Sequence, residues 1–290
     1  PVEHEGQTLV ALRDPEGYAE ETLVLSPAAF FIATCLNGTN DTVDIQYEFA
    51  KQFTGVVLTA ENIMQIVRQL DEHGFLLSGQ FTQLRDRVID VFAKSPVRPA
   101  YFAGKSYPEE PNDLREFLRE MLSGENQSPQ SDDTSASPLR CLIVPHIDFD
   151  RGRTAYAHGY TRLAREPKPN TIFIFGVAHA GPAAPYILTK KHFDTPLGQV
   201  PVDGDIVDRL ASICTWSPFE HELIHRTEHS IEFQAVLLAQ IFGEGPRIVP
   251  ILCGPLPLTP GTPDPVATPE IEVFLEECHA IAAEDPQSTI

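Results

Sequence analysis

The sequence predicts an α/β protein of two parts, a small N-terminal winged-helix-like domain and a larger C-terminal α/β domain. Three runs in the second half, "CLIVP", "TIFIFG" and "RIVPILCG", are apolar without alternation, which is typical of strands buried on both faces of a sheet. Segments of helical periodicity separate these runs, as in a sheet sandwiched between helices. The first third of the chain shows mainly helical patterns, and we therefore assign it to a separate domain.

The N-terminal domain is predicted to cover residues 1–94. The segment "SPAAFFIATCLNG" has Ser26 as a helix N-cap and Pro27 at the first helical position. Two more helical patterns follow, "TVDIQYEFAKQF" and "TAENIMQIVRQLDEHGF", the second capped by Thr59. With short extended pieces at "TLVAL" and "GFLLS", these helices predict a winged-helix-like module with a small β-wing.

The C-terminal domain is predicted to cover residues 95–290, after a connecting helix over 81–97 and a hinge at Ser95-Pro96. Its first element, "LREFLREML", is an amphipathic helix. The stretch 123–138 is too polar to pack and is interrupted by prolines, so we expect a flexible surface loop there. Beyond it the three apolar runs alternate with helices that include "DIVDRLASI" and "SIEFQAVLLAQIF".

Composition excludes some partners. The 290 residues include 21 Lys and Arg against 41 Asp and Glu, a formal charge of -20, which disfavours nucleic acid and anionic membrane surfaces. Residues 26–80 hold two basic side chains against six acidic ones, so this module lacks the basic face of a DNA reader. A peptide- or protein-docking role and a purely structural role both remain open for it.

Compartment and redox state follow from what the sequence lacks. No apolar run of about 18 residues suggests a membrane span, and no secretory signal opens the chain; we expect a cytoplasmic protein. Five scattered cysteines without CxxC spacing predict reduced thiols. Because the chain opens on proline and closes on "QSTI", which resembles the start of a strand, we expect it to be a fragment.

Two of the predicted strands end in the same way. "CLIVP" leads to His146, and "TIFIFG" leads to His179 in "GVAHAG". Ligands bind outside the carboxyl ends of the strands in open α/β sheets, so we expect these imidazoles to converge on one metal or catalytic site. The competing interpretation, in which both are ordinary turn residues, has about equal weight at this point.

A third cluster lies in "HELIHRTEHSIEFQ". We expect a helix to begin near Thr227, which places Glu228, His229 and Glu232 on it and leaves His221 and His225 in an exposed loop. Charged groups at the start of an apolar helix are paired, liganded or facing a cavity. This favours a site role for His229 and Glu232, against the alternative of a solvated first turn stabilised by the helix dipole.

Six ordered motifs resemble one family. "RPAYFAGKSYP", "PHIDFDRG", "FIFGVAHAG", "FDTPLGQVPVD", "EHSIEFQ" and "IVPILCG" occur in the order and spacing of the Memo-like proteins, also called the AmmeMemoRadiSam system protein B family. The resemblance begins at Arg98 and runs to the end of the chain. The N-terminal part resembles the PqqD-like winged-helix modules that precede Memo domains in some bacterial members.

The resemblance implies a fold similar to the class III extradiol dioxygenases, with a pocket for iron or copper. In that pattern His146 and His179 match the two metal-binding histidines, and His229 matches a pocket histidine that would act as acid or base. Family members have a further Ser-Asp-x-x-His motif and in some a cysteine ligand, which we expect beyond Ile290. Cys253 is a candidate thiolate only by its position.

Two functions from different classes follow. The first is a metal-binding protein, with the activity of a non-heme iron or copper dependent oxidoreductase of the dioxygenase type as the expectation that the resemblance adds. The alternative is a non-catalytic protein that binds a peptide or protein partner, through the N-terminal domain, and acts with radical-SAM and AMMECR1-like partner proteins. A metal with open coordination positions would favour the first function, and a fully ligated metal would favour the second.

Overall fold

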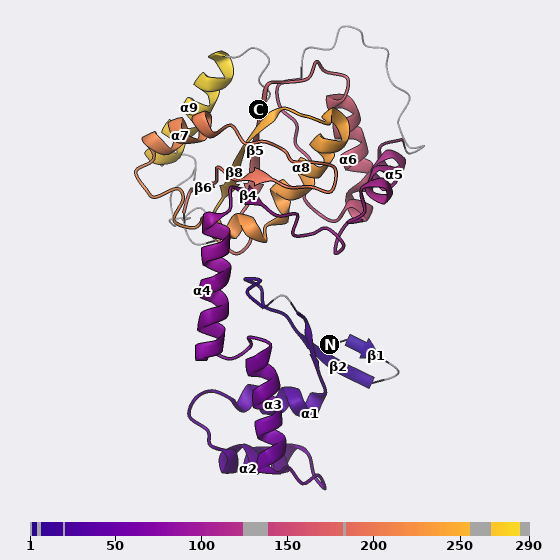
Figure 1. Ribbon diagram of the computed structural model, residues 1–290, viewed down its shortest axis with the longest axis vertical. Coiled ribbons are helices and arrows are strands. Elements are labelled where there is room, and N and C mark those ends of the chain that lie inside the picture. The colour runs from indigo at the N-terminus through magenta and orange to yellow at the C-terminus, as the bar shows by residue number, and fades with distance from the viewer. Residues whose placement is uncertain are drawn as a thin grey trace. The chain divides into compact units, whose positions relative to one another are not determined.

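The computed structural model describes residues 2–4, 7–19, 21–123, 139–181, 184–255 and 268–284 (Figure 1). Contacts between residues divide the chain into two compact units, Pro1–Ala93 and Lys94–Ile290. Across these ranges no helix is both long and apolar enough to cross a bilayer. The predicted loop over 123–138 and the predicted strand start "QSTI" lie, apart from Ser123, outside the described residues.

The N-terminal unit combines a small antiparallel sheet with helices, in the order β1-β2-β3. Its elements are β1 (Val2–His4), β2 (Gln7–Leu12), β3 (Leu23–Leu25), α1 (Pro27–Cys35), α2 (Thr42–Gln52), α3 (Ala60–Glu72) and α4 (Gly79–Lys94). Ser26 caps α1 as predicted, and Thr59 caps α3 in a capping box with Asn62. Ile32, Ile45, Phe49 and Ile63 form the core between α1, α2 and α3.

One element of this unit was predicted wrongly. "GFLLS" is not a strand but a turn before α4, and Leu77 in it is 96% exposed. The second sheet partner of β2 is instead β3, which pairs Val10 with Leu25. Three apolar residues in a row without period-two alternation do not distinguish a strand from a turn.

The C-terminal unit is an α/β structure. Its elements are β4 (Val97–Arg98), α5 (Pro111–Ser123), α6 (Phe149–Leu163), β5 (Thr171–Val177), β6 (Tyr186–Leu188), β7 (His192–Phe193), α7 (Gly204–Ile213), the 3-10 turn η1 (Glu222–Arg226), α8 (His229–Phe242), β8 (Arg247–Cys253) and α9 (Pro269–Glu284). "TIFIFG" and "RIVPILCG" thus form the predicted strands β5 and β8.

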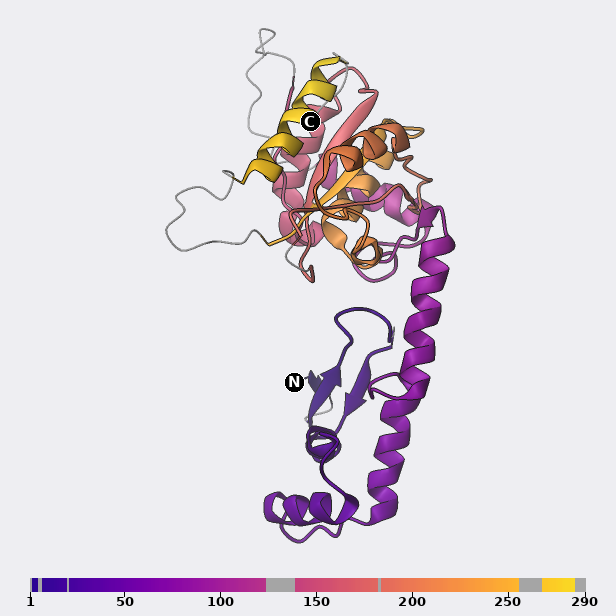
Figure 2. The ribbon, with the colours of Figure 1, turned by 90° about the vertical axis from the view of Figure 1, so that its left-hand side faces the viewer.

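The main sheet has the order β5-β8-β6. β8 pairs in parallel with β5 over seven residues and antiparallel with β6. Helix α8 packs on one face of β5, where Ile231 lies against Gly176. On the other face Phe274 of α9 stacks on Tyr186 of β6, with 4.3 Å between ring centroids, and α9 (yellow in Figure 2) lies alongside the sheet. The sheet is therefore covered on both faces, which explains the unbroken apolar runs.

The predicted strand "CLIVP" has a different outcome. Residues 139–146 belong to no strand, although burial alternates along them: Leu142 and Val144 are half-buried, while Cys141 and Ile143 are exposed. Leu142 and Val144 both lie against Gly159 of α6. The segment is therefore extended and packed on one side, but it has no hydrogen-bonded neighbour among the described strands.

We predict that Gly176→Ala destabilises this unit. An added Cβ would lie 2.6 Å from Ile231 Cγ1 and 2.6 Å from Ser230 Oγ, and overpacking a core in this way costs about 1–3 kcal/mol. The matched control is Gly204→Ala, where the nearest atom is 3.9 Å away. Chemical unfolding followed by fluorescence of Trp216 measures both; equal stability of the two variants would contradict the close packing of α8 on β5.

Candidate metal centre

Three histidines from separate parts of the C-terminal unit meet at one place. His146 follows the extended segment 139–145, His179 follows β5, and His229 is the first residue of α8. Each offers one ring nitrogen, and these three atoms lie within 4.8 Å of one another. Among the described residues this is the group of histidine, cysteine or acidic side chains whose spacing suits a metal ion. The structure thus brings together the three histidines singled out from the sequence.

The rings face one another closely. The His179 and His229 rings are stacked with 4.7 Å between centroids and an interplanar angle of 18°. The His146 ring lies 5.2 Å from the His179 ring and 5.8 Å from the His229 ring. Because side chains from three elements converge, the geometry depends on how each backbone segment is held.

The loop that carries His146 is held on both sides of the histidine. Gln234 Nε2 of α8 donates to the carbonyl of Pro145 at 3.3 Å, and Tyr156 Oη of α6 donates to the carbonyl of Ile147 at 2.9 Å. The Tyr160 hydroxyl donates to Gln234 Oε1 at 2.6 Å and orients the amide. Two helices therefore position the residue before His146 and the residue after it.

Glu228 holds His179. This residue is the N-cap of α8, and its carboxylate accepts hydrogen bonds from the backbone N–H of Ser230 (2.9 Å) and of His179 (3.1 Å). His179 Nδ1 lies 3.0 Å from Glu228 Oε2. Burial raises the pKa of the Glu228 carboxyl, but the hydrogen bonds from Ser230 and His179 outweigh burial and hold that pKa below its usual value.

The tautomer of His179 follows from this contact. An ionised carboxylate only accepts hydrogen bonds, so Nδ1 of His179 must carry the proton. Nε2 then keeps its lone pair, which is the form that binds a metal. A carboxylate behind a histidine is the usual support of metal-binding imidazoles.

Ser230 joins the start of α8 to the end of β5. Its hydroxyl accepts from the backbone N–H of Val177 at 2.9 Å and lies 3.2 Å from the carbonyl of the same residue. This pair of contacts sets the distance between the two elements that carry His229 and His179. Ser230 is buried, so solvent does not compete for these bonds.

His229 lies in a partly apolar environment, with the rings of Phe102 and Phe233 at 5.7 and 5.4 Å from its own. Burial lowers the pKa of the His229 imidazole; the nearby Glu228 carboxylate opposes this shift, and the neighbouring His179 and His146 rings add to it. The ring is consequently neutral at pH 7, and a neutral imidazole is the form that coordinates metals.

Glu232 is paired inside the protein, so the geometry does not support the predicted site role. Its side chain is fully buried and forms an ion pair with the equally buried Arg98. Glu232 Oε1 also accepts hydrogen bonds from the hydroxyl of Tyr107 and from the backbone N–H of Phe102 (2.8 Å). The carboxylate is thus paired, one of the three possibilities that the sequence left open, and it is not part of the three-histidine cluster.

Arg98 is the residue that the sequence reasoning missed. It lies in β4, which pairs with β7, and its guanidinium donates to the carbonyls of His225 (2.8 Å) and Glu228 (2.9 Å). Those carbonyls belong to the turn before α8 and to its N-cap. Arg98 therefore anchors the backbone that carries Glu228 and His229.

The prediction that His225 is an exposed loop residue is wrong. It lies in η1, is 1% exposed, and its Nε2 donates to the carbonyl of Ile187 at 3.1 Å. His221 is partly exposed and, like His225, is not part of the three-histidine cluster. Cys253, the positional candidate for a thiolate, is also outside the cluster, and burial raises the pKa of its thiol to about 11.

The buried His225 predicts acid sensitivity. Burial lowers the pKa of its imidazole from 6.5 to about 3, so the unfolded chain binds a proton between these pH values while the folded chain does not. The stability present above pH 6.5 is lost as the pH falls, by roughly 2–3 kcal/mol at pH 4.5. Between pH 7 and 4.5 we expect the free energy of unfolding of His225→Gln to fall less than that of the parent. Denaturant unfolding followed by Trp216 fluorescence measures both. The exposed His158→Gln is the control and should keep the parent slope.

Comparison with known proteins identifies the family. Residues 98–259, more than half of the chain, match the family model described as "Memo-like protein". A MEMO1 family protein of Aquifex aeolicus is 28% identical over 241 residues, which cover 83% of this chain and 61% of that protein. A MEMO1 family protein of Desulfurococcus amylolyticus is 31% identical over 165 residues, 56% of each chain.

A MEMO1 family protein of Thermus thermophilus is 27% identical over 213 residues, 72% of this chain and 61% of that protein. The chain thus spans about six tenths or less of the length of these curated relatives. The matched region contains Arg98, all three clustered histidines and Glu228. The C-terminal unit is a Memo domain, and the chain belongs to the Memo-like protein family.

Proposed function

We propose that this chain is a metal-binding protein whose C-terminal unit holds one ion between His146, His179 and His229. The observation that carries the proposal is the approach of the three ring nitrogens to within 4.8 Å. A nitrogen ligand lies about 2.0–2.1 Å from zinc, so two ligand atoms on one such ion are at most about 4.2 Å apart. Small rotations of the rings are enough to bring the three nitrogens to that spacing.

The chemistry of the donors suits a transition metal. Three imidazole nitrogens favour zinc, copper, iron or nickel over magnesium or calcium, which prefer oxygen ligands. The Glu228 carboxylate behind His179 supplies the negative charge and the orientation that support such a site. Iron or copper is the ion that we propose, and the family resemblance rather than the geometry supports this choice.

The role of His229 has two competing assignments. As a third ligand it would complete a set of three imidazoles, and its distance from the other two nitrogens supports this role. As an acid or base it would stay off the metal. Its lowered pKa would then keep the ring unprotonated near neutral pH, in the form that accepts a proton. We favour the ligand role. Metal content separates the two, because only a ligand is needed for binding.

A redox activity is the finer part of the proposal. A bound iron or copper ion would supply the one-electron and dioxygen chemistry of a non-heme oxidoreductase, as the resemblance to class III extradiol dioxygenases implies. The residues of this chain would orient the imidazoles through Glu228 and keep one side of the rings apolar through Phe102 and Phe233. The half-exposed His179, 46% accessible at its side chain, leaves that ring open to a substrate.

The alternative is a non-catalytic docking protein, and one feature of the N-terminal unit favours it. Val43 and Tyr47, four residues apart on α2, are 66% and 64% exposed. The antiparallel sheet and three short helices support the winged-helix-like, PqqD-like assignment, and the acidic surface disfavours DNA. In this function a peptide or protein, or a radical-SAM or AMMECR1-like partner protein, would be the ligand.

The experiment that tests the metal proposal is elemental mass spectrometry of anaerobically purified protein. We expect about one iron or copper ion per chain, lost in His146→Ala and His179→Ala, and lost in His229→Ala if that ring is a ligand. His158→Ala, an exposed histidine of α6, is the matched control and should keep its metal. Metal-free parent protein that also fails to bind added Fe²⁺ or Cu²⁺ would overturn the proposal.

A further inference from the structure

The loop over residues 99–107 reaches the histidine cluster from the segment between β4 and α5. The ring of Phe102 in this loop lies 5.7 Å from the His229 ring, measured between centroids. The Tyr101 ring in turn lies 5.1 Å from the Phe102 ring, at an interplanar angle of 78°. Two successive ring contacts therefore connect Tyr101 to a residue of the candidate metal centre.

The loop is anchored in the buried part of the unit. The backbone N–H of Phe102 donates to Glu232 Oε1 at 2.8 Å, and the Tyr107 hydroxyl donates to the same oxygen. Arg98 Nη1 donates to the carbonyl of Pro99 at 2.7 Å. Arg98 and Glu232 are fully buried and paired with each other. Both ends of the loop are thus fixed to an ion pair that solvent does not reach.

Hydrogen bonds within the loop fix its tip. The backbone N–H groups of Lys105 and Ser106 donate to the carbonyl of Phe102 at 3.0 and 2.9 Å, and the N–H of Gly104 donates to the carbonyl of Tyr107 at 2.8 Å. Gly104 has a φ of 72°, in the left-handed region that glycine adopts without strain. The exposed Lys105 is therefore carried by a hydrogen-bonded turn.

The Lys105 ammonium lies on an aromatic ring and not beside a carboxylate. Its Nζ is 3.6 Å from the centroid of the Tyr101 ring, and the guanidinium carbon of Arg226 is 5.6 Å from the same centroid. The face of an aromatic ring attracts cations at such distances. Lys51 and Lys190 each pair with a carboxylate, whereas Lys105 forms no ion pair within the part of the chain that the structure describes. The ring positions the ammonium without neutralising its charge.

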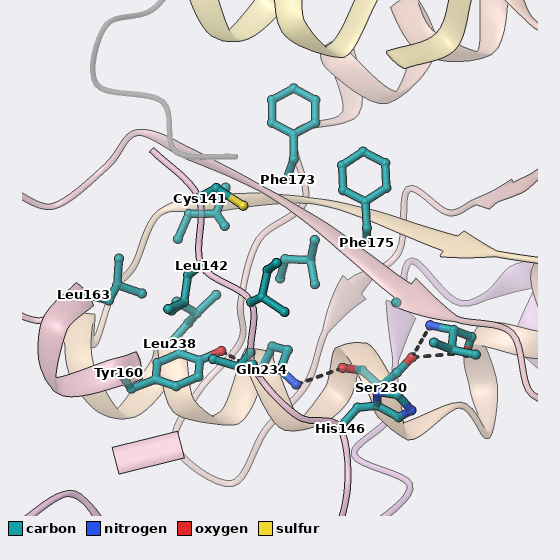
Figure 3. A pocket seen from close by; sticks show the side chains of 16 residues that line it. Cys141, Leu142, His146, Tyr160, Leu163, Phe173, Phe175, Ser230, Gln234 and Leu238 are labelled. Carbon is teal, nitrogen blue, oxygen red and sulfur yellow. Dashed lines mark hydrogen bonds between the residues drawn. The ribbon is translucent and has the colours of Figure 1, made fainter. Parts of the chain in front are cut away.

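The cluster also borders an apolar pocket, in which His146 and Ser230 lie close together (Figure 3). The pocket measures about 260 Å³, and none of the described residues that line it is Asp, Glu, Lys or Arg. Moving an anion into such surroundings without a charged partner costs several kcal/mol. An anionic group near the cluster is therefore stable on the side of Lys105 and not in this pocket.

We propose that Lys105 binds a carboxylate of the substrate, so that the substrate of the metal centre is a small carboxylic acid whose other end reaches the ion. The place of that other end rests on the metal site proposed above. The contact with Lys105 does not, because Arg98 and Glu232 hold the loop without any ion. Since the chain has a formal charge of -20, an anionic substrate needs a local cation of this kind to approach the centre.

The chemistry of one ammonium group favours a carboxylate over a phosphate. An ammonium has three N–H donors, and an ionised carboxylate has two oxygens that only accept. A phosphate monoester carries about 1.5 to 2 negative charges at pH 7, so the net charge of the chain repels it more strongly. The rings of Tyr101 and Phe102 lie between the ammonium and His229. We therefore expect the part of the substrate between its two ends to be apolar.

The test uses the full chain without metal, in a buffer of low salt that contains a chelator. The probes are benzoate and benzamide, which have similar shapes and differ in charge. We expect benzoate to shift the backbone amide NMR signals of residues 101–106 and to saturate at a concentration at least about tenfold below that of benzamide, as hydrogen bonds to charged groups predict. The ring signals of His229 should shift along the same saturation curve, because the probe lies beside Phe102.

Variants of Lys105 and of two other charged residues provide the comparison. Lys105→Met should bind the two probes equally weakly, and Lys105→Arg should keep the preference for benzoate. Lys51→Met is the matched control, because Lys51 Nζ lies 4.0 Å from the Tyr47 ring centroid in the N-terminal unit. Glu109→Gln is the second control, since a Cβ at Gly104 would lie 3.0 Å from Glu109 Oε2. Both controls should keep the preference of the parent.

Three results would overturn the proposal. The first is equal affinity of the parent for benzoate and benzamide. The second is a Lys105→Met variant that keeps the preference for benzoate, and the third is saturation of the loop signals without any shift of the His229 ring. Because no metal is present in these titrations, their outcome is separate from the metal content that tests the proposed function.

Discussion

Replacing Arg98 by methionine is expected to lower the free energy of unfolding of the C-terminal unit by about 3–5 kcal/mol, the usual effect of removing one partner of a buried ion pair. The substitution leaves the fully buried Glu232 carboxylate uncompensated. It also removes the donors to the carbonyls of His225 and Glu228. Equilibrium unfolding in urea, followed by Trp216 fluorescence, measures the loss.

The control and the second variant separate charge from packing. Arg247 is 61% exposed and lies 3.6 Å from Asp203, so Arg247→Met should cost less than about 1 kcal/mol, as for surface pairs. The double variant Arg98→Met with Glu232→Leu removes both buried charges and should recover part of the stability. If Arg98→Met is no more damaging than Arg247→Met, the buried pair does not anchor the start of α8.

The sequence was sufficient for elements whose signal is local. β5 and β8 are continuous apolar runs, α1 and α3 carry capping residues at their first turns, and all of them are found where predicted. The meeting of His146 and His179 was also predicted, but only His179 follows a strand of the sheet, because the segment before His146 belongs to no described strand. His229 was added to the site for a different reason, because a helix was predicted to begin in "EHSIEFQ".

Residues whose role depends on distant partners were not predictable in this way. Arg98 was quoted in the motif "RPAYFAGKSYP" without a role, because its partners, His225 and Glu228, lie 127 and 130 residues away. A buried arginine has no periodicity that marks it. The burial of His225 was missed for the same reason, since nothing in "HELIHR" indicates that Ile187 provides a carbonyl for its ring.

The segment "CLIVP" shows a different limit. Its composition predicts a strand, and its alternating burial agrees with an extended backbone, but strand pairing is a property of two segments. A single run of sequence cannot specify its neighbour.

Glu228→Gln is expected to weaken metal binding by about 10–100-fold, the usual range for loss of a hydrogen-bond partner behind a metal-binding histidine. The glutamine keeps the size of the side chain and can still accept from Ser230 N–H, so the start of α8 should persist. The glutamine amide can donate as well as accept, so His179 Nδ1 is no longer required to carry the proton. In the other tautomer Nε2 carries the proton and has no lone pair for the ion. A Co²⁺ titration followed by visible absorption, in competition with a chelator, measures the affinity.

Glu222→Gln is the matched control. Glu222 is a partly buried carboxylate of the same unit that accepts from Thr189 Oγ1 at 2.7 Å and is not part of the histidine cluster, so its loss should leave Co²⁺ affinity unchanged. Nitrogen NMR of the parent should show His179 with the proton on Nδ1, and Glu228→Gln should populate the other tautomer. A merely structural role for Glu228 would change stability without moving this tautomer, because only the contact between the carboxylate and Nδ1 selects it.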